Sequence, residues 1–146
     1  NTGNLLGARW LQNVLGESYN VHPLEDIYAF SHIDSTIVCL NEDLVLLNPD
    51  RVKLDKLPKS LRDRRCIFSP DMAETRVSGH SYASKWVGMN LFSLAPDLAI
   101  VDQNQIELIR LLEKNKVSVI PLELRHSRVL GGGFHCITLD LCREAK

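Results

Sequence analysis

The strongest candidate for chemistry in this chain is a cysteine that follows a run of glycines. Residues 131–133 are all glycine, and Cys136 lies three positions after them. Backbone without Cβ atoms can pass close to a ligand, and a cysteine at the glycine-rich start of a strand, expected here at 137–139, is well placed to be accessible and activated. The pattern indicates a thiol nucleophile at Cys136. The alternative, a tight glycine turn followed by a buried thiol, stays open.

A histidine and an aspartate far upstream are of the right types to serve that thiol. His32 lies at the end of a predicted loop and before a predicted strand. Histidine transfers protons near neutral pH, and a thiol nucleophile needs such a partner. Asp34 follows two residues later, so on an extended chain it shares a face with His32 and could orient the imidazole or bind a cationic substrate. A surface histidine beside an ordinary polar residue is the alternative. His135 would face away from Cys136 on a strand.

The elements that must position these residues are predicted from periodicity and turn residues. Apolar residues at helical spacing indicate a helix over 5–15, ended by Gly16. Short apolar runs separated by Asn and Asp predict a hairpin of 36–40 and 44–47. The other expected elements are a short strand over 19–24, a helix around 59–64, a strand at 66–68, a helix over 106–112 and a strand at 117–120. The chain is therefore expected to be of the α/β class.

Two parts of the chain repeat this order of elements. The tetrapeptides that begin at Asp43 and at Asp97 each follow a short apolar stretch, and each precedes a polar patch, a helix and a further strand. The predicted unit is strand, strand, helix, strand, with a chance similarity of two short patterns as the alternative. Fewer than three such units fit, so a repeat of this kind would need neighbours to complete its core.

Composition and charge exclude several functional classes. The formal net charge is −1, which argues against a nucleic-acid-binding surface. No run of 18 apolar residues predicts a membrane span. The four cysteines include no Cys-x-x-Cys pair, so a zinc ribbon is not expected. Cys39 lies in an apolar run and is predicted to be a buried thiol. Reduced thiols and a cytoplasmic protein are the expectation.

Four blocks of residues occur in a fixed order: His-Ile-Asp-Ser-Thr (32–36), Leu-Asn-Pro-Asp-Arg (47–51), Ser-Lys-Trp-Val-Gly-Met-Asn (84–90) and Gly-Gly-Gly-Phe-His-Cys (131–136). Together they resemble the amidinotransferase family of guanidine-modifying enzymes, that is, L-arginine:glycine amidinotransferase and its relatives. The resemblance is to the C-terminal portion and runs over nearly the whole chain. It implies a pentein fold, an α/β propeller of five strand-strand-helix-strand units, of which residues 1–146 would be the C-terminal part of a single domain with the upstream units absent. Pairing with the missing N-terminal part, or a homo-oligomer, would then complete the core.

The resemblance also implies a reaction. Cys136 matches the nucleophile that attacks the guanidinium carbon of L-arginine and releases ornithine, and His32 matches the general acid and base. Asp34 matches a carboxylate that contacts the guanidinium, Arg51 a residue that holds the substrate carboxylate, and Ser84 a serine near the substrate. The covalent amidino-cysteine passes its amidino group to a small amine acceptor. Neither a metal nor an organic cofactor is implied, and secondary metabolite biosynthesis is an expected setting.

Three departures from the family pattern bear on function. The family's aspartate partner to the histidine lies upstream of the first helix, and Asp26 is too close to His32 to be the same element. Ala83 replaces the first of two adjacent serines, and Ser31, a small residue, precedes the histidine. We therefore expect an acceptor other than glycine alone. A related deiminase-type hydrolase and a non-catalytic fragment are the alternative functions.

Overall fold

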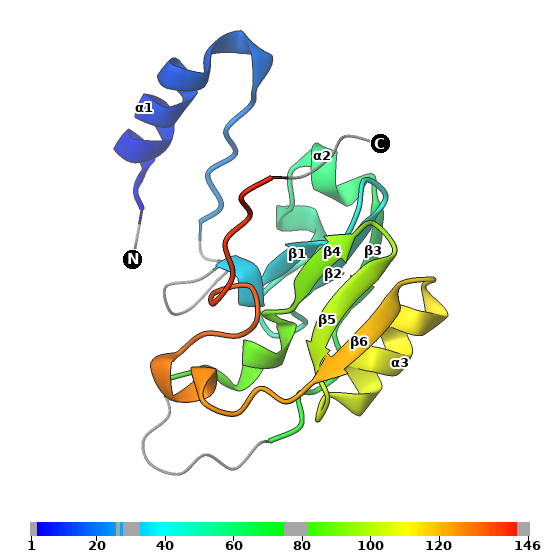
Figure 1. Ribbon diagram of the computed structural model, residues 1–146. Coiled ribbons are helices and arrows are strands. Elements are labelled where there is room, and N and C mark those ends of the chain that lie inside the picture. The colour runs from blue at the N-terminus through cyan, green and yellow to red at the C-terminus, as the bar shows by residue number, and fades with distance from the viewer. Residues whose placement is uncertain (1–2, 26, 28–32, 75–81, 143–146) are drawn as a thin grey trace.

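The computed structural model describes residues 3–25, 27, 33–74 and 82–142. Within them the chain forms two small three-stranded sheets with helices beside them (Figure 1). The helices are α1 (Leu5–Leu15), α2 (Lys59–Arg62) and α3 (Ile106–Lys114). The strands are β1 (Ile37–Cys39), β2 (Leu44–Leu47), β3 (Arg65–Phe68), β4 (Phe92–Ala95), β5 (Leu98–Asp102) and β6 (Ser118–Leu122). The predicted α/β class is confirmed.

The two sheets have the same strand order and the same strand directions. β2 is antiparallel to β1 and parallel to β3, and β5 is antiparallel to β4 and parallel to β6. Equivalent hydrogen bonds begin each parallel pair: the Asp43 carbonyl accepts from the Arg65 N–H at 2.8 Å, and the Asp97 carbonyl accepts from the Ser118 N–H at 2.7 Å. Positions related by the sequence offset between Asp43 and Asp97 therefore have the same structural role in the two sheets.

The hairpin between β1 and β2 is closed by the side chain of Asn41. Its Oδ1 accepts from the backbone N–H groups of Asp43 at 3.0 Å and Leu44 at 2.8 Å, which is the local bonding that favours asparagine in turns. Its Nδ2 donates to the carbonyl of Pro96 at 2.8 Å, in the turn of the second sheet. One turn residue therefore both closes the first hairpin and ties it to the second.

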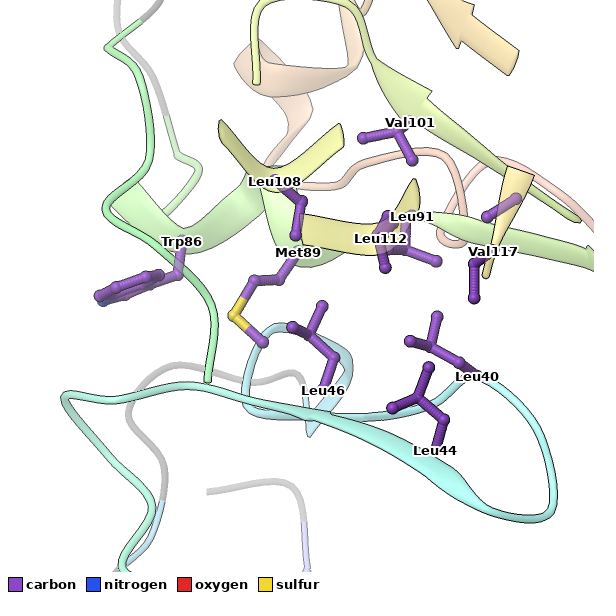
Figure 2. Packing of buried hydrophobic residues seen from close by; sticks show 11 residues of the cluster. Leu40, Leu44, Leu46, Trp86, Met89, Leu91, Val101, Leu108, Leu112 and Val117 are labelled. Atoms are coloured by element: carbon purple, nitrogen blue, oxygen red, sulfur yellow. The ribbon is translucent and has the colours of Figure 1, made fainter. Parts of the chain in front are cut away.

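One hydrophobic cluster joins the two sheets. Leu44 and Leu46 of β2 point toward Leu108 and Leu112 of α3, and Met89 lies beside them (Figure 2). The opposite face of β2, with Val45 and Leu47, packs on a second, smaller cluster that includes residues 52 and 57. Because β2 is buried on both faces, its run of four apolar residues does not alternate with polar ones, as is typical of a central strand with covered faces.

The first helix has the predicted bounds but lies apart from the sheets (Figure 1). Asn4 caps its N-terminus by accepting from the Gly7 N–H at 2.8 Å, and Gly16 ends it with φ of 68°. No residue of α1 is buried, and Trp10 is 67% exposed. The described residues therefore do not cover the apolar side of this helix.

The strand predicted over 19–24 is wrong. The segment is irregular, and the side chain of Gln12 supplies its hydrogen bonds: the amide donates to the carbonyls of Gly16 and Tyr19 and accepts from the Val21 N–H, each at 2.8 Å. A side-chain amide here takes the place that a neighbouring strand would have, and Pro23 removes a further donor.

The predicted burial of Cys39 is also wrong, because its thiol is exposed. Cys39 ends β1, which lies at the edge of its sheet. Val38 packs against the core, so alternation along the strand turns Cys39 to the other face. No helix in the described part of the chain is long and apolar enough to cross a membrane.

The shared core predicts a large cost for truncating Leu112. This side chain is 0% exposed, so Leu112→Ala leaves a cavity between α3 and β2 and should lower the free energy of unfolding by about 2–5 kcal/mol. Ile106, on the same helix, is 50% exposed, and Ile106→Ala should cost about 1 kcal/mol or less. Denaturant unfolding of the full-length protein checks this, and equal losses for the two variants would contradict the packing described.

Candidate active site

Cys136 lies in a compact turn, and the predicted strand over 137–139 is absent. Gly131 has φ of 89°, a conformation that favours glycine. A Cβ atom at Gly132 would lie 2.6 Å from the Cβ of Cys136, and one at Gly133 would lie 2.6 Å from the carbonyl oxygen of Asn90. The glycines are needed because the turn folds tightly on itself and against Asn90.

Asn90 holds this turn from the other side. Its Oδ1 accepts from the backbone N–H of Gly133 at 2.9 Å and from that of Cys136 at 3.1 Å, and its own carbonyl accepts from the His135 N–H at 3.3 Å. The residue is buried. Sequence reasoning assigned no role to Asn90, although it ends the block at 84–90 that carries the family resemblance; that block was the available signal.

Asp34 brings the turn into contact with the first half of the chain. It lies in a single 3-10 turn, η2 (Ile33–Ser35), and not on the extended chain that was expected. Its Oδ2 accepts from the thiol of Cys136 at 3.5 Å and lies 3.1 Å from Nδ1 of His135. The expectation that His135 faces away from Cys136 is wrong, because a turn, unlike a strand, can present neighbouring side chains to one partner.

The surroundings of Cys136 change the pKa of its thiol in the free protein, with a net shift upward. Burial raises the pKa of the Cys136 thiol, and the negative charge of Asp34 raises it further. Hydrogen bonds from the Gly133 N–H and from the Asn90 side chain oppose this by lowering the pKa. A positive charge placed between Asp34 and the sulfur would therefore favour the reactive thiolate.

Arg51 is held against the residues that follow Asp34. Its guanidinium donates to Oγ1 of Thr36 at 2.9 Å and to Oγ of Ser35 at 3.1 Å. Partial burial lowers the pKa of Arg51, and the guanidinium remains charged. Arg51 is thus bound to the two residues that follow Asp34 in the chain.

Ser84 is linked to the cysteine turn through a 3-10 helix, η4 (Lys85–Met89). Its Oγ accepts from the Trp86 N–H at 3.2 Å at the start of η4, and Asn90 follows the end of η4. Asp50 connects η4 to the Arg51 turn, because its Oδ2 accepts from Lys85 at 2.6 Å and from Nε1 of Trp86 at 3.1 Å. The Lys85 ion pair is the main cause that lowers the pKa of Asp50.

A groove of about 400 Å³ opens beside Asp34 and His135. Residues of both β1 and β4 line it, so it runs between the first strands of the two sheets. Among the described residues no group of His, Cys, Asp and Glu side chains is arranged to hold a metal ion.

The structure brings two of the five residues singled out in the sequence into contact, Asp34 and Cys136. Arg51 instead binds Ser35 and Thr36, the two residues that follow Asp34. Ser84 is joined to them only through η4. His32, the expected general acid and base, lies outside the described residues, as do Ser31 and Asp26.

Curated proteins similar to this chain are amidinotransferases. Inosamine-phosphate amidinotransferase 1 of Streptomyces griseus is 51% identical over 146 residues, 99% of this chain and 42% of that protein. L-arginine:L-lysine amidinotransferase of Pseudomonas savastanoi pv. phaseolicola is 32% identical over 148 residues, 100% of this chain and 40% of that protein. Mitochondrial glycine amidinotransferase of Xenopus tropicalis is 32% identical over 147 residues, 97% of this chain and 34% of that protein. No protein-family model matches.

Solved structures give the same result. An inosamine-phosphate amidinotransferase from Streptomyces griseus superposes with a TM-score of 0.92 at 50% identity, over 99% of this chain and 42% of that one. An amidinotransferase of the saxitoxin biosynthetic pathway from Microseira wollei superposes with a TM-score of 0.90 at 31% identity, over 98% of this chain and 40% of that one. The chain thus spans about two-fifths of the length of these relatives. The predicted resemblance is confirmed: in sequence and in fold, this chain is similar to amidinotransferases along nearly its whole length.

Proposed function

We propose that the protein containing this chain transfers an amidino group from L-arginine to an amine acceptor through a covalent amidino-cysteine at Cys136. The observation that carries this proposal is the contact between the Cys136 thiol and the Asp34 carboxylate at 3.5 Å, across 102 positions of sequence. A carboxylate pairs with the planar N–H fork of a guanidinium. Oδ1 of Asp34 is buried and has no hydrogen-bond partner among the described residues, so this oxygen is free to accept such an N–H.

Binding of the substrate cation would activate the nucleophile. In the free site the pKa of the Cys136 thiol is raised by burial and by Asp34. A guanidinium bound to Asp34 neutralises that negative charge and adds a positive one close to the sulfur, which favours the thiolate. The thiol proton passes to His32, which serves as general base in this proposal.

The transfer then proceeds in two half-reactions. The thiolate forms a bond to the guanidinium carbon, the bond from that carbon to the δ-nitrogen of arginine breaks, and His32 returns its proton to that nitrogen as ornithine leaves. The acceptor amine next attacks the amidino-cysteine and gives a proton to His32. The carbon–sulfur bond breaks, and the new guanidino compound leaves while the thiol is restored. Arg51 would hold the carboxylate of the donor.

The fold of the complete protein is part of this proposal. The two sheets with equal strand order, joined through one hydrophobic cluster, support this proposal because they match the strand-strand-helix-strand units expected of a pentein propeller. We propose that this chain forms the C-terminal part of such a five-unit domain. The exposed apolar side of α1 and the groove between β1 and β4 are surfaces that further units would cover.

The acceptor is proposed to be an amine larger than glycine. Ala83 and Ser31 are small residues where the family resemblance places groups near the substrate, so they leave room and remove a polar contact. Identity is 51% to an inosamine-phosphate amidinotransferase and 32% to a glycine amidinotransferase, which supports a bulky acceptor such as an inosamine phosphate. A setting in secondary metabolism agrees with these relatives.

Removing the charge of Asp34 should have opposite effects on thiol reactivity and on turnover. Asp34→Asn lowers the pKa of the Cys136 thiol, so alkylation of Cys136 by iodoacetamide at pH 7 should become about three- to tenfold faster, since each pKa unit changes the thiolate fraction about tenfold. Transfer from arginine should fall about 10- to 100-fold, because the guanidinium loses a charged hydrogen bond. Asp63→Asn, on an exposed side chain, is the control. Slower alkylation in Asp34→Asn would contradict the electrostatics described.

Cys136→Ser should reduce transfer by several orders of magnitude, because the covalent intermediate cannot form. Wild-type protein given arginine alone should carry the amidino group on Cys136, detected by peptide mass spectrometry. With an acceptor, the products should be ornithine and a new guanidino compound. Cys142→Ser, at another exposed thiol, should retain activity. Citrulline as the main product would show that the protein is a hydrolase.

A competition assay decides the acceptor. With L-arginine as donor, an inosamine phosphate or L-lysine should be used with a kcat/KM at least about tenfold above that for glycine, because a site without a hydrogen-bonding partner for a small acceptor discriminates poorly in its favour. Replacing Ala83 with Ser should move the preference toward glycine. Glycine preferred over every larger amine would refute this acceptor assignment.

A further inference from the structure

His135 makes a second contact between the cysteine turn and the Asp34 carboxylate. Its Nδ1 lies 3.1 Å from Oδ2 of Asp34, the same oxygen that accepts from the Cys136 thiol at 3.5 Å. His135 and Asp34 are 101 positions apart in the chain, and both line the groove of about 400 Å³ between β1 and β4. The transfer proposed above gives His135 no part, although its imidazole bonds the carboxylate that would receive the guanidinium.

The two oxygens of the Asp34 carboxylate have different surroundings. Oδ2 is bonded by His135 and by the Cys136 thiol, whereas Oδ1 is buried and has no hydrogen-bond partner among the described residues. A carboxylate and a guanidinium pair best as two planar forks that share a plane. The hydrogen bond to Oδ2 restricts rotation of the carboxylate group, so it sets the plane in which Oδ1 can accept an N–H of the substrate.

The backbone of His135 is held from both sides. Its N–H donates to the Asn90 carbonyl at 3.3 Å, and its own carbonyl accepts from Oγ1 of Thr138 at 3.0 Å. The His135 side chain, in contrast, is 61% exposed, while that of Asp34 is 20% exposed. The imidazole therefore reaches the carboxylate from a fixed backbone position, and its replacement should not disturb the packed core.

The bond to Asp34 also fixes the position of a proton. A carboxylate accepts hydrogen bonds and has no hydrogen to donate, so the hydrogen in this bond is on Nδ1 of His135. Neutral histidine in water favours the tautomer with its hydrogen on Nε2, and a hydrogen bond to one ring nitrogen decides which tautomer is present. The Nδ1–H tautomer of His135 is therefore an observable sign of this contact.

We propose that His135 is a positioning residue for Asp34: its Nδ1–H group holds Oδ2, so that the carboxylate stays in the plane that binds the substrate guanidinium. This deepens the proposed function, because it rests on Asp34 as the guanidinium-binding residue. A contact that only stabilised the turn would affect the use of arginine whether or not residue 34 is a carboxylate. A positioning residue acts through Asp34, so substitutions at the two positions must be coupled.

Two substitutions of His135 separate the hydrogen bond from the rest of the side chain. His135→Asn keeps an N–H donor in the place of Nδ1, whereas His135→Leu has a similar size and makes no hydrogen bond. In the full-length protein, with the acceptor that the competition assay selects, His135→Leu should lower kcat/KM for L-arginine about three- to tenfold, because it removes a hydrogen bond to a charged group. His135→Asn should stay within about twofold of the wild type. His126→Leu, at an exposed histidine in the loop after β6, is the matched control.

The coupling is measured with a double-mutant cycle. In Asp34→Asn, which is expected to retain a measurable rate, adding His135→Leu should change kcat/KM for L-arginine by less than about twofold, because residue 34 no longer presents the carboxylate that His135 holds. The same three- to tenfold loss in both backgrounds would overturn the proposal, since the effect of His135 would then not pass through Asp34. An equal loss in His135→Asn and His135→Leu would overturn it as well.

Imidazole ¹⁵N NMR of histidine-labelled protein tests the contact without any substrate. At a pH where His135 is neutral, its signals, assigned by their absence in His135→Asn, should show the Nδ1–H tautomer in the wild type and the Nε2–H tautomer in Asp34→Ala. An Nε2–H tautomer in the wild type would refute the proposal. An Nδ1–H tautomer in a protein that does not use arginine would uphold the pairing of His135 with Asp34 and reject amidino transfer.

Discussion

The burial of η4 is the constraint on which the rest of the site depends. Residues 86–89 are all buried, and Trp86 and Met89 belong to the cluster that joins β2 to α3. No space remains beside Gly88, where a Cβ atom would lie 2.5 Å from the sulfur of Met72. A close-packed segment of this kind cannot shift without opening cavities. Ser84 before η4 and Asn90 after it are therefore held at fixed positions. Asn90 in turn fixes the cysteine turn through its hydrogen bonds to Gly133 and Cys136.

Equivalent polar residues at the ends of β2 and β5 anchor the two halves of the site. Asn48 donates to the carbonyl of Ser35 at 2.8 Å and so fixes η2, which carries Asp34. Asp102, its counterpart in the second sheet, forms a buried ion pair with Arg128 of η5 (Ser127–Leu130), the helix that leads into the glycine turn. Buried charges stabilise only when their partners are well placed, and Asp102 also accepts from the Asn104 N–H. The same strand end thus holds a different segment of the candidate site in each sheet.

Much of this organisation was readable from the sequence because its causes are local. The bounds of α1 follow from helical spacing and from Gly16, and the β1–β2 hairpin follows from two apolar runs with Asn41 between them. The repeat was visible as a pattern around Asp43 and Asp97, since each sheet is built from consecutive elements. Cys136 was identified by the three glycines that precede it. The structure explains these glycines, because the turn packs too closely on itself and on Asn90 to allow side chains at 132 and 133. These features depend on residues a few positions apart.

The sequence by itself determined the α/β class, the order of the elements in the two sheets and the candidate residues for chemistry. Only the tertiary structure decided which side chains meet. The strand predicted at 19–24 is absent, and the side chain of Gln12 bonds the backbone of that segment. The strand predicted at 137–139 is absent, and Thr138 bonds back to the carbonyls of Phe134 and His135 in the cysteine turn. His135 and Cys136 both turn to Asp34, about a hundred positions away, because a turn replaces the expected strand. Such contacts depend on how segments that are distant in sequence pack together. Sequence periodicity indicates helices and strands, but it does not indicate which distant side chain a residue will contact.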